Sequence, residues 1–200
     1  MKKLLIICFS IMSLTAFCQN RQTKNMLREI QGQWQQDDNG NVTYVRIVEA
    51  KGISKEKIYN RALNYFIYDY GNGKSAIQIK DPDLGRIVNK GLYDDVHIGV
   101  DLSTTSYIDT WHIVRIDIKE NRARIILTLT EYEKKITDRS PIPSYSTARV
   151  NEEFPINPGG FYKTVMGKAF VKSHDRAIAT LDRIEKAINE GNTELENDDW

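Results

Sequence analysis

The sequence predicts an α+β fold in which an antiparallel sheet of about five to six strands packs beneath helices. Apolar residues recur at steps of three and four between residues 54 and 70, and again from residue 161 to 191. Between these two segments, apolar and polar residues alternate with the period of strands that have one wet side. Turn-forming residues separate the alternating segments, which is typical of an antiparallel meander.

Residues 1–18 are predicted to be a signal peptide. Lys2 and Lys3 precede an apolar run over residues 4–14, and a small-x-small end leads to Cys18. The run holds only about a dozen apolar residues, whereas a bilayer-spanning helix needs roughly 20. We therefore expect an exported protein, periplasmic or envelope-associated, with no transmembrane span after cleavage before Gln19. The alternative is a lipoprotein acylated on Cys18, although the large Phe17 precedes that cysteine where a small residue is usual.

The two cysteines and the charge balance exclude several functions. Cys8 and Cys18 both lie in the signal segment, so cleavage before Gln19 leaves no thiol for catalysis or metal binding. Loss of Lys2 and Lys3 reduces the 28 basic residues to 26, against 27 acidic ones, for a net charge of about −1. Non-specific binding to nucleic acid requires a basic footprint, so we expect no nucleic-acid partner.

The chain then begins with a polar lead-in, a strand and a helix. Residues 19–41 are polar and include a short helix predicted over 26–30 and one large apolar residue, Trp34. Residues 42–49 alternate as a strand and begin the main domain, predicted over 42–132. Ser54 is a suitable N-cap for the helix that follows, and the Gly-Asn-Gly sequence at 71–73 is suited to end it. The apolar side of that helix is predicted to comprise Ile58, Tyr59, Ala62, Leu63, Phe66 and Tyr70.

A series of strands follows the helix. Ile77 and Ile79 define a strand at 75–80, and Pro82 and Gly85 supply the turn before its partner at 86–92. Further strands are predicted at 96–102, 107–118 and 123–132, the last two joined by a tight turn at 119–122.

The remainder of the chain is predicted to be a loop, a helix and a tail. Residues 133–160 contain four of the five prolines and little periodicity, so a long loop is expected there. A helix is expected over 161–191, with a break or second cap at 173–175 and a stop at Gly191. Residues 192–200 form an acidic tail. The buried stripe of the helix is predicted to be Met166, Phe170, Ala177, Leu181, Ile184 and Ile188.

The segments GISKEKIYNRALNYF and IQIKDPDLGRIVNKG, after a signal that ends before Gln19, resemble a secreted Bacteroidetes family. That family is a domain of unknown function with a TATA-binding-protein-like (TBP-like) fold. The resemblance covers about residues 42–132 and implies a curved antiparallel sheet with helices on one face, in β-α-β4-α order. It implies no DNA binding and supplies no catalytic residues. The residues that carry it are Ser54, Ile58, Tyr59, Ala62, Asp81, Gly85 and Gly91.

Motifs that could carry chemistry do not meet their spacing requirements. The GNGKS sequence at 71–75 lacks the first glycine of a phosphate-binding loop, since Tyr68 stands there. The acidic stretch 37–41 lacks the closing glutamate of a calcium loop, since Arg46 occupies that position. His97, His112 and His174 show no ligand spacing. We therefore predict no catalytic residue, no metal ligand and no cofactor.

An aromatic surplus on the first helix leaves candidates for ligand binding. Tyr65 and Tyr68 exceed what one helix face can bury, so they are expected to point toward the long loop or a ligand. Packing in the core or against the loop is favoured over a binding surface. Trp34 is the third candidate, although packing at the edge of the core is the simpler interpretation. The function favoured is a non-catalytic binding module for a small ligand or an envelope protein. A structural or interaction subunit of an envelope assembly is the alternative, and an enzyme is the least supported.

Overall fold

The computed structural model describes residues 21–70, 76–101, 104–138, 142–156 and 163–191. Residues 21–29 are helical, and the remaining elements follow in a simple order. They are β1 (Gln35–Gln36), β2 (Val42–Glu49), α2 (Lys55–Asn64), the π-helical turn η1 (Tyr65–Asp69), β3 (Ala76–Asp81), β4 (Arg86–Asp101), β5 (Thr104–Lys119), β6 (Arg122–Thr137), β7 (Ser144–Arg149) and α3 (Lys163–Glu190).

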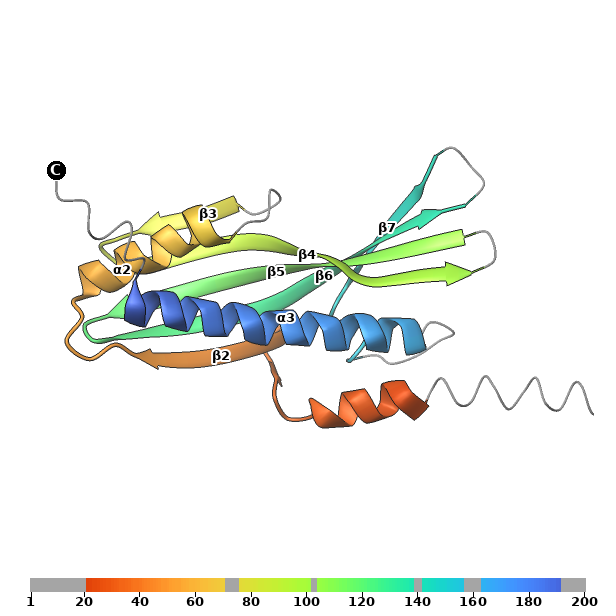
Figure 1. Cartoon of the computed structure of the whole chain (residues 1–200), viewed down its shortest axis with the longest axis horizontal. Coiled ribbons are helices and arrows are strands. Elements are labelled where there is room, and N and C mark those ends of the chain that lie inside the picture. The colour runs from red at the N-terminus through yellow and green to blue at the C-terminus, as the bar shows by residue number, and fades with distance from the viewer. Residues whose placement is uncertain (1–20, 71–75, 102–103, 139–141, 157–162, 192–200) are drawn as a thin grey trace, which may run out of the picture.

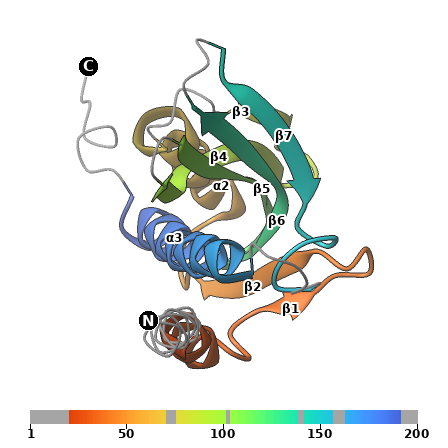
Figure 2. The same ribbon diagram turned by 90° about the vertical axis from the view of Figure 1, so that its right-hand side faces the viewer.

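The strands form one antiparallel sheet in the order β1-β2-β6-β5-β4-β3. Strand β6 pairs with β2 along its first half and with β7 along its second half, so β2 and β7 share one side of β6. Helices α2 and α3 lie together on one face of the sheet (Figure 1), and the sheet bends around α3 (Figure 2). The predicted α+β fold with helices on one face is confirmed. No described helix is long and apolar enough to cross a membrane.

The core lies between the sheet and the two helices. Alternate residues of β5 and β6 point into it, as their sequence period predicts, and they meet the apolar stripes of α2 and α3. A fully buried aliphatic side chain contributes about 1.5–3 kcal/mol relative to its exposed state, so this layer is the main source of stability. Its fully buried members include Ile58, Val114, Ile116, Ile125, Leu127, Leu129, Ile184 and Ile188.

Polar pairs fix α3 against the sheet. The Tyr44 hydroxyl and Nδ1 of His174 are 3.1 Å apart, and the Thr110 and Ser173 hydroxyls are 2.8 Å apart. Ser173 also donates to the carbonyl of Ala169 at 2.8 Å, so its hydroxyl is satisfied inside a continuous helix. The predicted break at 173–175 is therefore wrong, because both polar side chains find partners without interrupting the backbone.

A buried aromatic cluster explains Gly91. His112 is fully buried, bonds through Nε2 to the hydroxyl of Tyr70, and stacks on Tyr93 with ring centroids 3.8 Å apart. A Cβ added at Gly91 would lie 2.7 Å from the Tyr70 hydroxyl, so only glycine leaves room for this bond. Burial lowers the pKa of His112 to about 3, which keeps its imidazole neutral.

Two strand predictions require correction. The segments 86–92 and 96–102, predicted as separate strands, belong to a single strand, β4, as far as Asp101. A bulge between Tyr93 and His97 interrupts its register, and Asp95 has a φ of 47° there. The loop predicted over 133–160 is wrong in part, because β6 continues to Thr137 and β7 occupies 144–149, whereas residues 150–156 form turns and bends. Most β7 side chains are exposed, so backbone pairing with β6 forms the strand without an apolar alternation.

The N-terminal segment packs on the core more closely than a polar lead-in would. The helix at 21–29 is longer than predicted, and Thr23 and Ile30 are buried. A Cβ at Gly167 would lie 2.7 Å from Cγ2 of Thr23, which shows how near this segment comes to α3. The predicted signal peptide at 1–18, the acidic tail at 192–200 and the helix stop at 71–73 lie outside the described residues.

The turn between β3 and β4 forms as its sequence predicts. Asp81 accepts from the amide of Leu84 at 2.9 Å, and Gly85 has a φ of +66°. The carbonyl of Gly85 accepts from the Ile118 amide at 2.7 Å, which ties this turn to β5. A Cβ at Gly85 would lie 2.5 Å from the Ile118 carbonyl oxygen, so the position excludes side chains on both conformational and steric grounds.

Substitution of Gly85 tests this account of the turn. Gly85→Ala is expected to lower the free energy of unfolding by about 3 kcal/mol or more, measured by urea denaturation. Gly52→Ala is the matched control, because Gly52 has a φ of +79° but nothing within 4 Å of an added Cβ. The control is expected to cost only about 1–2 kcal/mol. Equal losses in the two variants would contradict the close approach to Ile118.

Candidate functional site: the open face of the sheet

The face of the sheet opposite α2 and α3 has no described helix over it. Side chains that point to this face alternate with the core residues, and several are apolar and exposed. Val45 and Ile47 of β2 are 46% and 54% exposed, and Ile79 of β3 is 46% exposed. We call this surface the open face.

Four charged residues gather at one end of the open face, and we call them the Asp117 cluster: Arg86, Arg115, Asp117 and Arg124. The register of the sheet places Arg86 and Arg124 directly opposite Asp117 on its two neighbouring strands. Arg115 lies two residues earlier on β5 and therefore shares the face of Asp117. The arrangement follows from strand pairing alone, so the backbone holds all four positions.

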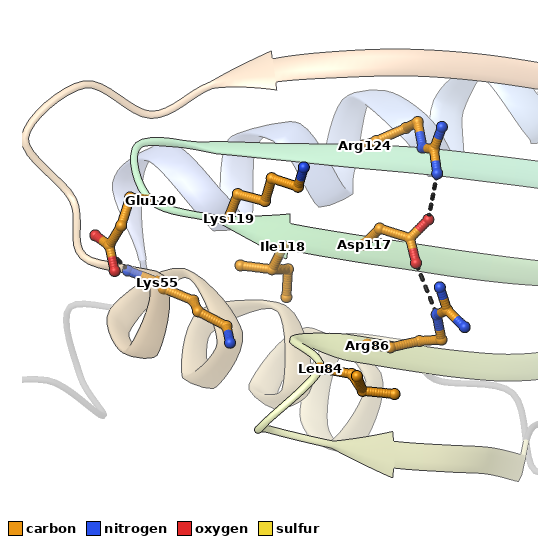
Figure 3. Close-up of a pocket in the computed structure, with 8 residues that line it drawn as sticks. All are labelled: Lys55, Leu84, Arg86, Asp117, Ile118, Lys119, Glu120 and Arg124. Carbon is orange, nitrogen blue, oxygen red and sulfur yellow. Dashed lines mark hydrogen bonds and ion pairs between the residues drawn. The ribbon is translucent and has the colours of Figure 1, made fainter.

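The Asp117 carboxylate accepts from all three guanidinium groups (Figure 3 shows two of them). Oδ1 accepts from Nε of Arg86 at 2.8 Å and from Nε of Arg115 at 3.0 Å. Oδ2 lies 2.9 Å from Nη2 of Arg115 and 2.8 Å from Nη2 of Arg124. Burial alone would raise the pKa of Asp117, but the hydrogen bonds from the three arginines lower it to about 2.

The carboxylate is covered while the arginines face solvent. The Asp117 side chain is 17% exposed, whereas those of Arg86, Arg115 and Arg124 are 37%, 38% and 50% exposed. One negative charge therefore lies beneath three positive charges. The outward surface of the cluster is cationic.

Two shallow cavities adjoin the cluster. One of about 450 Å³ lies between the β3–β4 turn, the β5–β6 turn and the start of α2, with Lys55 and Leu84 on its border (Figure 3). A second of about 290 Å³ lies on the other side of Arg124, with Ile47 and Arg122 on its border. Asp117, Lys119 and Arg124 line both cavities, so the cluster forms the ridge between them.

The aromatic candidates from the sequence lie elsewhere. Tyr65 is 3% exposed, so the expectation that it points away from the core is wrong; it lies seven residues after Ile58 and therefore on the same helix face. Tyr68 is 61% exposed, as expected. Trp34 is half-buried, packs edge-on against Phe170, and lines a separate cavity of about 310 Å³. The prediction that these residues bind a ligand stays a prediction.

The remaining polar motifs have structural partners. The ring nitrogens of His174 lie within hydrogen-bond distance of the Tyr44 hydroxyl and of the Gln33 side chain. The carboxylate of Asp37 accepts from the amides of Asn39 and Asn41, so residues 37–41 form a turn before β2. Within the described ranges, no three His, Cys, Asp or Glu side chains come close enough together to hold a metal ion.

Sequence reasoning missed the Asp117 cluster. Each of its members lies on a predicted strand among core residues, and none belongs to a motif. The available signal was the alternation itself, since Arg115 and Asp117 fall between Val114, Ile116 and Ile118. That pattern assigns both charges to the wet face. Arg86 and Arg124 come next to these two residues only through the strand register, which the sequence pattern does not reveal.

Acidification tests the role of Asp117. Its pKa is lowered by folding, so its contribution to stability is present above about pH 4 and is lost as pH falls through about 2. At neutral pH, Asp117→Asn is expected to reduce the free energy of unfolding by about 1–2 kcal/mol, because solvent screens the partly exposed arginines. Urea denaturation of both proteins from pH 7 to pH 2 should show this difference disappear at the acid end. A difference that is independent of pH would contradict the ion pairing.

Comparisons with known proteins identify the domain. Residues 44–133 match the family described as "Domain of unknown function (DUF4468) with TBP-like fold". The fold is similar to that of a DUF4468 family protein from Bacteroides ovatus, with a TM-score of 0.57 and 15% identity, covering 82% of this chain and 94% of that one. It is also similar to a TBP-like protein from Parabacteroides distasonis, with a TM-score of 0.52 and 17% identity, covering 75% of this chain and 96% of that one. A search of curated proteins finds no match. Residues 44–133 therefore resemble the DUF4468 family, and the fold of the chain is TBP-like.

Proposed function

We propose that this chain is an exported, non-catalytic binding module of the periplasm or cell envelope, and that it binds its ligand on the open face of the sheet. The proposal rests on three features that occur together on that face. Two cavities, a cationic ridge and exposed apolar side chains such as Ile47 occur together where no described helix covers the strands. Ligand sites commonly combine apolar surface with a few fixed polar groups in this way.

The chemistry of the titratable groups supports binding rather than catalysis. Asp117 is a poor general base, because its lowered pKa means a weak affinity for protons. His112 and Tyr93 have shifted pKa values, but both are buried between the sheet and α3 and lie away from the open face. A reaction would require titratable groups that converge on an accessible cavity.

Export is supported by the sequence of residues 1–18, with its basic start, apolar run and small-x-small end. A binding module in the envelope would meet anionic and amphiphilic molecules, which suit a surface that carries both guanidinium groups and aliphatic side chains.

An interaction subunit of an envelope assembly is the second candidate, and the ends of two hairpins favour it. Ile98 and Val100 near the end of β4 are 50% and 79% exposed. Ile142, before β7, and Tyr145 within it are 77% and 61% exposed. Exposed apolar side chains of this size, gathered at strand ends, are common where a protein partner docks.

Mass spectrometry of the protein purified from its own envelope tests the proposal. The intact mass is expected to correspond to a chain that begins at Gln19, or to an acylated chain that begins at Cys18; a mass that includes residues 1–17 would contradict export. Under gentle ionisation the protein is expected to retain a bound small molecule.

Two matched variants locate that molecule. Ile47→Glu, on the open face, is expected to reduce the bound fraction at least about fivefold, because it places a charge on an apolar contact surface. Val100→Glu adds the same charge at a hairpin end and is expected to leave the bound fraction unchanged. Equal loss in both variants, or no bound molecule in any preparation, would contradict a ligand site on the open face. Recovery of a protein partner that only Val100→Glu releases would favour the interaction subunit.

A further inference from the structure

We propose that the Asp117 cluster is a binding site for a tetrahedral dianion of the phosphate type, carried by a larger molecule that rests on Leu84 or Ile47. The inference deepens the proposed function and rests on it. It assigns a chemical class to the ligand of the open face, and three features of the cluster support it: its charge, its unused hydrogen-bond donors and the rigidity of its strands.

The charge of the cluster is incompletely balanced. One carboxylate faces three guanidinium groups, which leaves an excess of two positive charges on the ridge. Lys119 and Arg122 line the adjoining cavities and add to this excess. The carboxylate of the nearby Glu120 accepts from the Lys55 amide at 3.2 Å, so its negative charge lies at the start of α2. Glu49 stands opposite Arg122 in the register and offsets that residue in part. A dianion would balance the charge of the three arginines.

The arginines also keep donors that the protein does not use. Each guanidinium has five N–H groups, and Arg86 donates to Asp117 only through Nε. Arg124 uses only Nη2. Among the described residues, neither the terminal nitrogens of Arg86 nor Nε and Nη1 of Arg124 meet an acceptor. Guanidinium groups bind phosphate oxygens in a forked geometry, so these two side chains are suited to grip one anion from both sides.

Asp117 positions these donors. It fixes one edge of each guanidinium at 2.8–3.0 Å and so directs the other edges toward solvent. The three arginines lie on three neighbouring strands, which pair in continuous register around Asp117. Backbone pairing therefore keeps the arginines from moving apart. Fixed donors cost little ordering entropy on binding, and this favours a specific anion site over a diffuse basic patch.

The exposed aliphatic groups beside the cluster indicate the rest of the ligand. Leu84 is 69% exposed on the border of the larger cavity, and Ile47 is 54% exposed on the border of the smaller one. A phosphate group on the ridge would place an attached sugar or acyl portion over one of these side chains. The same group occurs on soluble phosphate monoesters and on lipid headgroups, so the experiment must distinguish the two sources.

The test uses the full chain and two probes. The first probe is inorganic phosphate, followed by calorimetry and by the NMR signals of the arginine Nε–H groups. The second probe is vesicles of phosphatidylcholine with and without phosphatidic acid, followed by co-sedimentation. Arg124→Gln and Arg86→Gln are each expected to weaken binding of the active probe at least about tenfold, the effect of losing one charge-assisted hydrogen bond.

Arg149→Gln is the matched control. Arg149 is 72% exposed and pairs in the sheet with Glu131, seven residues along β6 from Arg124, so its removal changes the net charge equally at a distant place. Binding of the control is expected to equal that of the wild type, and thermal unfolding checks that every variant is folded. Binding of inorganic phosphate indicates a soluble ligand, whereas binding only to phosphatidic acid vesicles indicates a lipid headgroup.

Two outcomes would overturn the assignment. One is no binding of either probe; the other is equal weakening by Arg149→Gln and Arg124→Gln, which would indicate diffuse attraction alone. If the assignment fails while the envelope-purified protein still retains a molecule that Ile47→Glu releases, the open face remains the binding surface and only the chemical class is wrong.

Discussion

The packing of α3 along one face of the sheet is the constraint on which the rest of the structure depends. One long amphipathic helix can bury only one of the two faces of a sheet. The helix supplies its apolar stripe and the hydroxyls of Ser173 and Thr180, which reach Thr110 on β5 and Tyr93 on β4 at 2.8 Å each. These directional bonds set the position of the helix along the strands, whereas apolar contact alone would tolerate sliding.

Placing α3 on one face determines where charge can be accommodated. On the helix side, the buried polar side chains are neutral, because an uncompensated charge there would lose its hydration. Tyr44, Tyr93 and Tyr132 accordingly have raised pKa values caused first by burial, and His112 is held neutral. On the open face, the same strands carry ionised groups at the alternate positions. Solvent stabilises three arginines there, and one carboxylate reduces their mutual repulsion.

Much of the fold was predictable from local sequence, and the reasons can be given residue by residue. Ser54 accepts from the amide of Lys57 at 3.3 Å as an N-cap, and Gly191 ends α3 with a φ of 72°, because both effects are local. Alternation identified β5 and β6 because buried side chains alternate with more exposed ones over residues 108–118 and 123–129. Strand β7 was missed because it buries neither face and depends on pairing with a distant strand, which periodicity cannot reveal.

The candidate site was less predictable than the fold, because it depends on register. Arg86 and Asp117 are 31 residues apart in sequence and meet only when β4 and β5 pair in the observed register. Trp34 and Tyr65 are ligand-binding candidates in the sequence because they are large aromatic residues, yet Tyr65 contributes to the core and Trp34 packs at its edge. Residues in ordinary alternating positions acquire a shared role only through tertiary structure, and no motif marks them beforehand.

The central claim is that α3 covers one face of the sheet and leaves the other open, and thiol labelling along β2 tests it most directly. Val45 and Val48 lie three residues apart on that strand and are 46% and 0% exposed. In a chain with Cys8 and Cys18 replaced by serine, Val45→Cys should react at nearly the rate of an unfolded chain. Val48→Cys should react only through unfolding, slower by a factor of at least about a thousand. Equal protection at the two positions, or faster labelling at position 48, would contradict the account.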